Sequence, residues 1–131
     1  MNIPAKEKLV IRNSFSLPYR GGEIFGIELD ALYIYRDIVQ KKFLHDMETV
    51  RRPSTSSKIG INLLQTEIDE TLAQCITSQL ALVNKTGMRV AFVVDRHGER
   101  LLRSALNNSQ ASFCRNFFRS YEAAKEWLIP V

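Results

Sequence analysis

The last third of the chain alternates between two hydrophobic patterns, and this alternation constrains the fold more than any other feature. Residues 88–95 form an apolar run typical of a buried strand, and residues 96–107 have the spacing of an amphipathic helix. A second strand-like run covers residues 112–118, and a second helical pattern covers residues 120–128. Strand, helix, strand and helix within about forty residues indicate a parallel α/β sheet.

The N-terminal segment predicts an antiparallel hairpin. Residues 8–13 suit a first short strand, and the proline and glycines of residues 17–22 suit a turn. The chain then returns through a second strand at residues 23–29. Alternation along this strand places three apolar side chains on one face, namely Phe25, Ile27 and Leu29. The unpaired edge of such a hairpin offers a surface for homodimer formation.

Helical spacing follows the hairpin. Asp30 suits the N-cap of a helix whose apolar stripe extends to Val50, although residues 31–35 would also suit an extension of the preceding strand. Residues 58–64 predict a third strand in the interior of the sheet, because they are almost continuously apolar.

A long helix is predicted after the third strand, from about residue 67 to residue 85. Gly87 is expected to end it, because glycine readily takes the left-handed conformation found at helix C-termini. The complete order of elements predicts one α/β domain over residues 1–131. Its sheet is a single mixed layer, mostly parallel, with about five strands and about four helices.

The composition is that of an ordinary globular protein with a mild positive charge. The 131 residues carry a formal net charge of +4, and acidic residues are scattered among the basic ones. The chain starts without a signal-peptide pattern and has no apolar run of membrane-spanning length, so we expect a cytoplasmic protein. Cys75 and Cys114 lack the spacing of metal or disulfide sites, which predicts two small core side chains and neither metal nor cofactor.

The sequence contains no catalytic motif. His97 lies beside Asp95 at the end of the fourth predicted strand, where parallel sheets bind ligands, and such a pair can act as an acid or a base. A solvated loop histidine explains the position better, and no nucleophile motif completes a triad. We therefore expect a protein that is not an enzyme, in which Gly21 and Gly22 form a hairpin turn rather than a phosphate loop.

Three arginines follow one stripe of the helix predicted over residues 96–107. Arg96, Arg100 and Arg103 can form a surface for an anion or an acidic partner, because guanidinium binds carboxylate and phosphate in a bidentate manner. A solvated face with a local pair between Glu99 and Arg103 is the alternative. Specific nucleic-acid binding is not predicted, because the sequence lacks a helix-turn-helix, an aromatic stacking platform and a concentrated basic tract.

Aromatic residues gather near the C-terminus, at Phe113, Phe117, Phe118, Tyr121 and Trp127. Phe113 and Phe117 fall on one face of the predicted strand, and Phe118 falls on the other. Core packing is the default explanation. The alternative is an apolar small molecule or lipid held between helices and sheet, which would make the protein a ligand carrier or sensor.

The order of elements and the C-terminal sequence resemble the STAS domain family, in particular the small bacterial proteins related to sporulation anti-sigma-factor antagonists. Residues 89–95 and 117–128 carry the resemblance, the latter reading FFRSYEAAKEWL. This segment is similar to the strand, turn and Ala-x-x-Trp-Leu helix that close those proteins. The resemblance covers most of residues 8–128. It implies a regulatory module that binds a protein partner, such as an anti-sigma-like kinase or another regulator.

In that family, a serine in the turn after the third strand is phosphorylated by the partner kinase. The corresponding segment here, residues 65–71, contains no serine. Its carboxylates could imitate a permanently charged state, or they could serve as ordinary acids at the positive end of a helix dipole. The resemblance implies partner binding through the residues of this turn, Thr66, Glu67, Asp69, Glu70 and Thr71.

Overall fold

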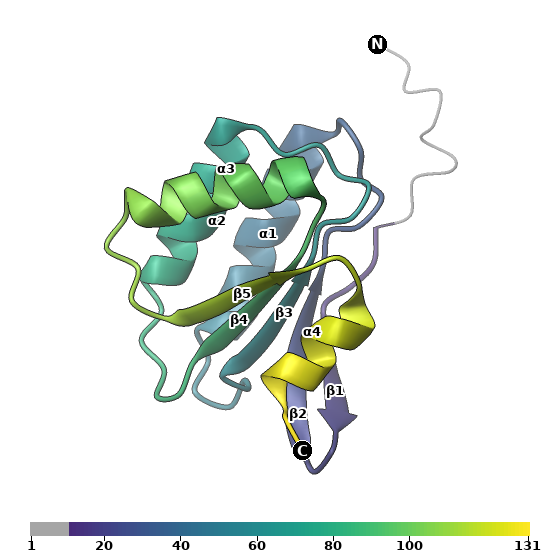
Figure 1. The fold of residues 1–131 in the computed structure, drawn as a ribbon, viewed down its shortest axis with the longest axis vertical. Helices are drawn as coiled ribbons and strands as arrows, with labels where there is room; N and C mark the ends of the chain where they lie inside the picture. The colour runs from purple at the N-terminus through teal and green to yellow at the C-terminus, as the bar shows by residue number, and fades with distance from the viewer. Residues whose placement is uncertain (1–10) are drawn as a thin grey trace.

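A computed structural model describes residues 11–131 as a five-stranded sheet with helices on both faces (Figure 1). The strands are β1 (Phe15–Tyr19), β2 (Gly22–Glu28), β3 (Lys58–Asn62), β4 (Arg89–Val93) and β5 (Cys114–Phe118). The helices are α1 (Arg36–Val50), α2 (Glu70–Ala81), α3 (Arg96–Asn107) and α4 (Tyr121–Leu128). The predicted α/β class, with a mixed and mostly parallel sheet, is confirmed.

The strands lie side by side in sequence order. β1 and β2 are antiparallel, and every later pair of neighbours is parallel. Parallel neighbours need crossover connections, and right-handed crossovers made in a constant direction place α1, α2 and α3 on one face of the sheet. Figure 1 shows these three helices on one side and α4 on the other. We call the edge where β2–β4 end and α1–α3 begin the carboxyl edge.

The sheet has an apolar core on each face. The larger core lies under α1–α3 and contains the predicted set Phe25, Ile27 and Leu29. In the same core, the rings of Phe92 and Phe117 stack with centroids 5.2 Å apart. The smaller core lies under α4 and is built from Ile24, Ala91, Val93, Ala124 and Leu128.

Two glycines let aromatic rings rest directly on the α4 face of the sheet. A Cβ added to Gly26 would overlap the ring of Phe15, and a Cβ added to Gly60 would lie 3.1 Å from the hydroxyl of Tyr121. The rings of Phe15 and Tyr121 meet edge to face with centroids 6.4 Å apart. The ring of Phe15 from β1 and the ring of Tyr121 from α4 therefore lie directly over these two glycines.

The hairpin is shifted relative to the prediction. The first strand predicted at residues 8–13 begins outside the described chain, and its last residues, 11–13, are not in a strand. β1 instead includes Pro18, which the sequence predicted to lie in the turn. Proline is tolerated there because β1 is an edge strand. Arg20 and Gly21 make the turn with φ values of 50° and 81°, so the predicted role of Gly21 is confirmed.

The prediction of Asp30 as a helix cap is wrong. Residues 29–35 form a loop, and α1 begins only at Arg36. Ala31 and Tyr33 have φ values of 62° and 50°, a conformation that continues neither a helix nor a strand. The alternative of a longer strand is therefore wrong as well.

The helix predicted over residues 67–85 is shorter in the structure. Asp69 caps α2 by accepting a hydrogen bond from the Leu72 amide at 2.8 Å. Leu82 occupies the C-cap in a right-handed conformation, so Gly87 does not end this helix. Gly87 does have a positive φ, of 69°, in the turn that leads into β4. The helix predicted over residues 96–107 coincides with α3.

Candidate functional site

Two loops run side by side at the carboxyl edge. Residues 29–35 follow β2 and residues 63–69 follow β3, and we refer to them together as the paired loops. The Tyr33 amide donates to the carbonyl of Gln65 at 3.0 Å, and the Glu67 amide donates back to the carbonyl of Tyr33 at 2.9 Å. The two loops therefore continue the parallel pairing of β2 and β3 beyond the strands.

Thr66 joins the paired loops from the inside. Its hydroxyl donates to the carbonyl of Leu29 at 2.5 Å and accepts from the amide of Leu32 at 3.1 Å. The residue is only 6% exposed. The sequence predicted a hydroxyl that contacts a partner, whereas the structure places it as a buried link between two backbone segments.

The backbone of the paired loops is strained. Ala31, Tyr33 and Gln65 all have positive φ values, of 62°, 50° and 54°. Residues with a side chain rarely adopt this conformation, and each instance costs about 1–2 kcal/mol. Such outliers cluster at functional sites, where the surrounding structure holds them in place.

The strained loop presents two large apolar side chains to solvent. Tyr33 is 53% exposed and its neighbour Ile34 is 68% exposed. The Tyr33 hydroxyl donates to Oε1 of Gln65 at 3.2 Å, which fixes the ring over the second loop. A hollow of about 310 Å³ lies beside these residues.

This hollow brings together two sets of residues that the sequence treated separately. It is lined by the turn after β3 and by the residues that begin α3, namely Tyr33, Ile34, Gln65, Thr66, Glu67, Ile68, Asp95 and His97. The Asp95 carboxylate accepts a hydrogen bond from the Gly98 amide at 2.7 Å and thereby caps α3. That bond explains Asp95 without catalysis, and His97 is an exposed residue on the rim.

The acidic residues of the predicted binding turn have different roles. Arg36 pairs with Glu67 at 3.0 Å and with Asp69 at 3.3 Å, so it ties the start of α1 to the start of α2. Asp69 is also the cap of α2. Glu70 and Thr71 are exposed in the first turn of that helix. Glu70 faces a different hollow, between α2 and α3.

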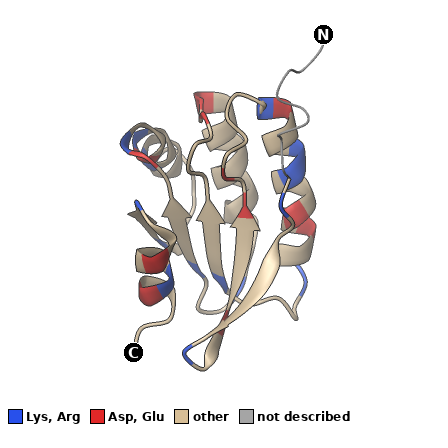
Figure 2. Cartoon of the chain, turned by 90° about the vertical axis from the view of Figure 1, so that its right-hand side faces the viewer, with Lys and Arg blue, Asp and Glu red and all other residues tan. Residues whose placement is uncertain are grey.

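The predicted arginine stripe is exposed, but its members differ. Arg103 pairs with Glu99 at 2.7 Å, and Arg119 pairs with the same carboxylate at 2.8 Å. The hydrogen bond from Arg103 is the main cause that lowers the pKa of Glu99. Arg96 and Arg100 have no acidic partner within residues 11–131. Figure 2 shows charges of both signs around the carboxyl edge, not a patch of one sign.

The C-terminal aromatic residues pack against their neighbours. The rings of Phe118 and Trp127 lie 5.7 Å apart, and the guanidinium of Arg89 lies 4.0 Å from the centre of the Trp127 ring. Cys75 packs against the larger core. Cys114 is exposed because it is the first residue of the edge strand β5. The prediction that both cysteines are core residues is therefore wrong for Cys114.

Sequence reasoning missed a polar cluster on the α4 side of β2. Three oxygens are buried there without a hydrogen-bond partner in the described chain, namely Oε1 of Glu28, Oδ1 of Asp30 and the hydroxyl of Tyr121. Burial is the largest effect on all three groups: it raises the pKa of Glu28 and Asp30, and it raises the pKa of Tyr121 to about 12. Alternation along β2, with acids opposite the apolar face, was the available signal.

Comparison with known proteins found no family model, no curated protein and no solved structure that matches this chain. Within residues 11–131, no helix combines the length and apolar character needed to cross a membrane. The same part of the chain holds no cluster of three or more acidic, histidine or cysteine side chains suited to a metal ion.

Proposed function

We propose that this chain is a non-enzymatic interaction module, as the STAS-like resemblance implies, and that it binds a protein partner through the paired loops. The exposure of Tyr33 and Ile34 carries the proposal, at 53% and 68% of their surfaces. Burying a large apolar side chain in an interface contributes about 1.5–3 kcal/mol. Tyrosine suits such a surface, because its ring packs while its hydroxyl keeps a polar contact.

The hollow beside these side chains suggests the chemistry of the contact. An apolar side chain of the partner would enter it and pack against Ile34 and Ile68, while polar groups around it would meet Gln65 and His97. The pair between Arg36 and Glu67 forms part of the same rim. This combination of apolar centre and polar rim is typical of protein interfaces.

Rigidity of the paired loops supports binding. Backbone hydrogen bonds join the loops, and the buried hydroxyl of Thr66 fixes them from below. A surface that is ordered before binding loses little conformational entropy when the partner arrives. The strained conformation is therefore present before the partner binds.

Regulation by phosphorylation, if this chain shares it with the family it resembles, would require Thr71. The hydroxyl of Thr66 is buried and engaged in two hydrogen bonds, so a kinase could reach it only if the loops opened. Thr71 is exposed in the first turn of α2. A phosphate there would lie at the positive end of the helix dipole.

Site-specific photocrosslinking in the source cells tests the proposed surface. One variant carries p-benzoylphenylalanine in place of Ile34, and a control carries it in place of Leu82, which is 72% exposed at the far end of α2. We expect a discrete crosslinked protein from position 34 only. That protein, once purified, should bind the wild-type chain and lose affinity for Ile34→Glu but not for Leu82→Glu.

Equal crosslinking at both positions, or equal affinity of both glutamate variants, would contradict the proposal.

Glu67→Arg and Glu70→Arg test the acidic residues of the turn. Asp69→Arg is unsuitable because Asp69 caps α2, and its loss would destabilise that helix. Native mass spectrometry addresses the apolar-ligand alternative, which requires a mass above that of the bare chain.

A further inference from the structure

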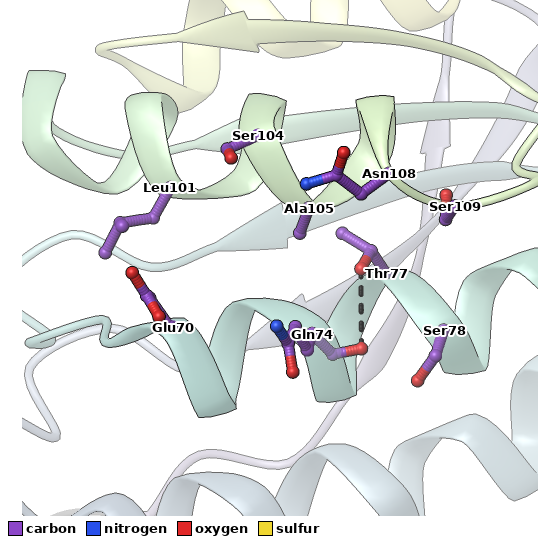
Figure 3. A pocket seen from close by; sticks show the side chains of 9 residues that line it. All are labelled: Glu70, Gln74, Thr77, Ser78, Leu101, Ser104, Ala105, Asn108 and Ser109. Carbon is purple, nitrogen blue, oxygen red and sulfur yellow. Dashed lines mark hydrogen bonds between the residues drawn. The ribbon is translucent and has the colours of Figure 1, made fainter.

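A second hollow lies on the outer surface, between α2 and α3. It measures about 350 Å³ (Figure 3), and none of its lining residues lines the hollow at the paired loops. Both helices contribute to its lining, four residues from α2 and five from α3 and its C-terminal end, namely Glu70, Gln74, Thr77, Ser78, Leu101, Ser104, Ala105, Asn108 and Ser109. Figure 3 shows the side chains of Leu101 and Ala105 pointing from α3 toward α2.

Four polar side chains in this groove are free to bind. The side chains of Glu70, Gln74, Ser104 and Asn108 make no hydrogen bond or ion pair within residues 11–131. Two of them are amides, each of which offers a donor and an acceptor from one group. By contrast, the hydroxyl of Thr77 is buried and donates to the carbonyl of Ala73 at 3.0 Å. The polar group at the base of the groove therefore already has a hydrogen-bond partner, whereas the polar side chains at its rim can still form hydrogen bonds with a ligand.

We propose that the groove between α2 and α3 binds a small neutral polyol, such as a single sugar or cyclitol ring. The amides of Gln74 and Asn108 can each bond a pair of neighbouring hydroxyls, and the carboxylate of Glu70 can accept from another. Leu101 and Ala105 supply an apolar surface for the C–H face of the ring. This mixture of donors, acceptors and apolar surface corresponds to the amphipathic character of a polyol.

Other classes of ligand fit less well. The lining contains no cationic side chain, and the carboxylate of Glu70 would repel an anion. An organic cation would find one carboxylate but no aromatic ring, the surface that binds such cations best. An apolar ligand would take Gln74 and Asn108 out of water without replacing their hydrogen bonds, which costs free energy. The volume lies at the small end of the range of roughly 300–1,000 Å³ for ligand sites, which favours one ring.

Titration of the ¹³C,¹⁵N-labelled protein with myo-inositol, and separately with D-glucose, tests the proposal by NMR. At least one of them should cause saturable shifts of the side-chain amides of Gln74 and Asn108 and of the methyl groups of Leu101. Asn108→Leu should weaken binding about tenfold, because it removes both hydrogen bonds of one amide. Asn107→Leu is the matched control, since Asn107 is exposed on the same helix and does not line the groove.

Three results would overturn the proposal: shifts that do not saturate, shifts spread over the whole surface, and equal weakening by the two asparagine variants. Spermidine and inorganic phosphate serve as charged probes. Saturable binding of either probe at Gln74, when neither polyol binds there, would also reject the proposal. Thermal unfolding of each variant establishes that the fold is intact. Because the groove is distinct from the paired loops, crosslinking at Ile34 should not depend on the polyol.

Discussion

Thr66 offers the most direct test of how the candidate surface is built. Thr66→Val keeps the shape of the side chain but removes the hydroxyl, which links the Leu29 carbonyl and the Leu32 amide at 2.5 and 3.1 Å. Both backbone groups lie in buried residues. A buried polar group left without a partner costs about 1–3 kcal/mol, so for two such groups we expect a loss of about 2–6 kcal/mol in the free energy of unfolding.

Thr66→Ser is the matched control for this prediction. It keeps the hydroxyl and loses one buried methyl group, which costs about 1 kcal/mol. Urea unfolding gives the three free energies, and amide hydrogen exchange at Leu32 should accelerate in the valine variant alone. Crosslinking from position 34 should likewise weaken in that variant and persist in the serine variant. Valine and serine variants of equal stability would refute the assignment of Thr66 as a structural link.

Three further predictions concern other parts of the chain. Burial raises the pKa of Glu28 above its ordinary value of 4.5, so the folded state holds this proton more tightly than the unfolded state does. The contribution of Glu28 to stability should fall as the pH rises from 4.5 through the raised pKa, so in urea titrations across this range the wild type should lose stability relative to Glu28→Gln. Gly87→Ala should lower the melting temperature by an amount equivalent to about 1 kcal/mol, because φ at Gly87 is 69°; an unchanged melting temperature would argue against that turn conformation. Iodoacetamide should alkylate Cys114 faster than Cys75 in the native protein, as peptide mass spectrometry would show, because Cys114 is exposed and Cys75 is half-buried; equal rates would contradict this difference.

The local sequence pattern was sufficient to predict the bounds of an element where the element's own residues determine them. α3 follows the prediction because its apolar stripe is regular and Asp95 caps its start. The starts of α1 and α2 could not be predicted in this way. Bonds such as that from the Tyr33 amide to the Gln65 carbonyl, at 3.0 Å, join residues far apart in sequence and hold the paired loops out of helical conformation. The sequence predicted the half of the candidate site that lies in the turn after β3. It did not predict the apolar half, Tyr33 and Ile34, which lies on the loop after β2.

The absence of glycine at the strained positions is informative about the surface. At about 1–2 kcal/mol each, Ala31, Tyr33 and Gln65 together cost a substantial part of the 5–15 kcal/mol that typically separates folded from unfolded domains. Glycine would relieve this strain, but at Tyr33 it would remove the exposed ring, and at Gln65 it would remove the amide that holds that ring in place. The side chains at these two positions therefore stand against the preference of the backbone, whereas Ala31 adds only a methyl group. This is expected of a surface whose side chains are needed for recognition, and it applies whether or not a phosphorylatable serine follows β3.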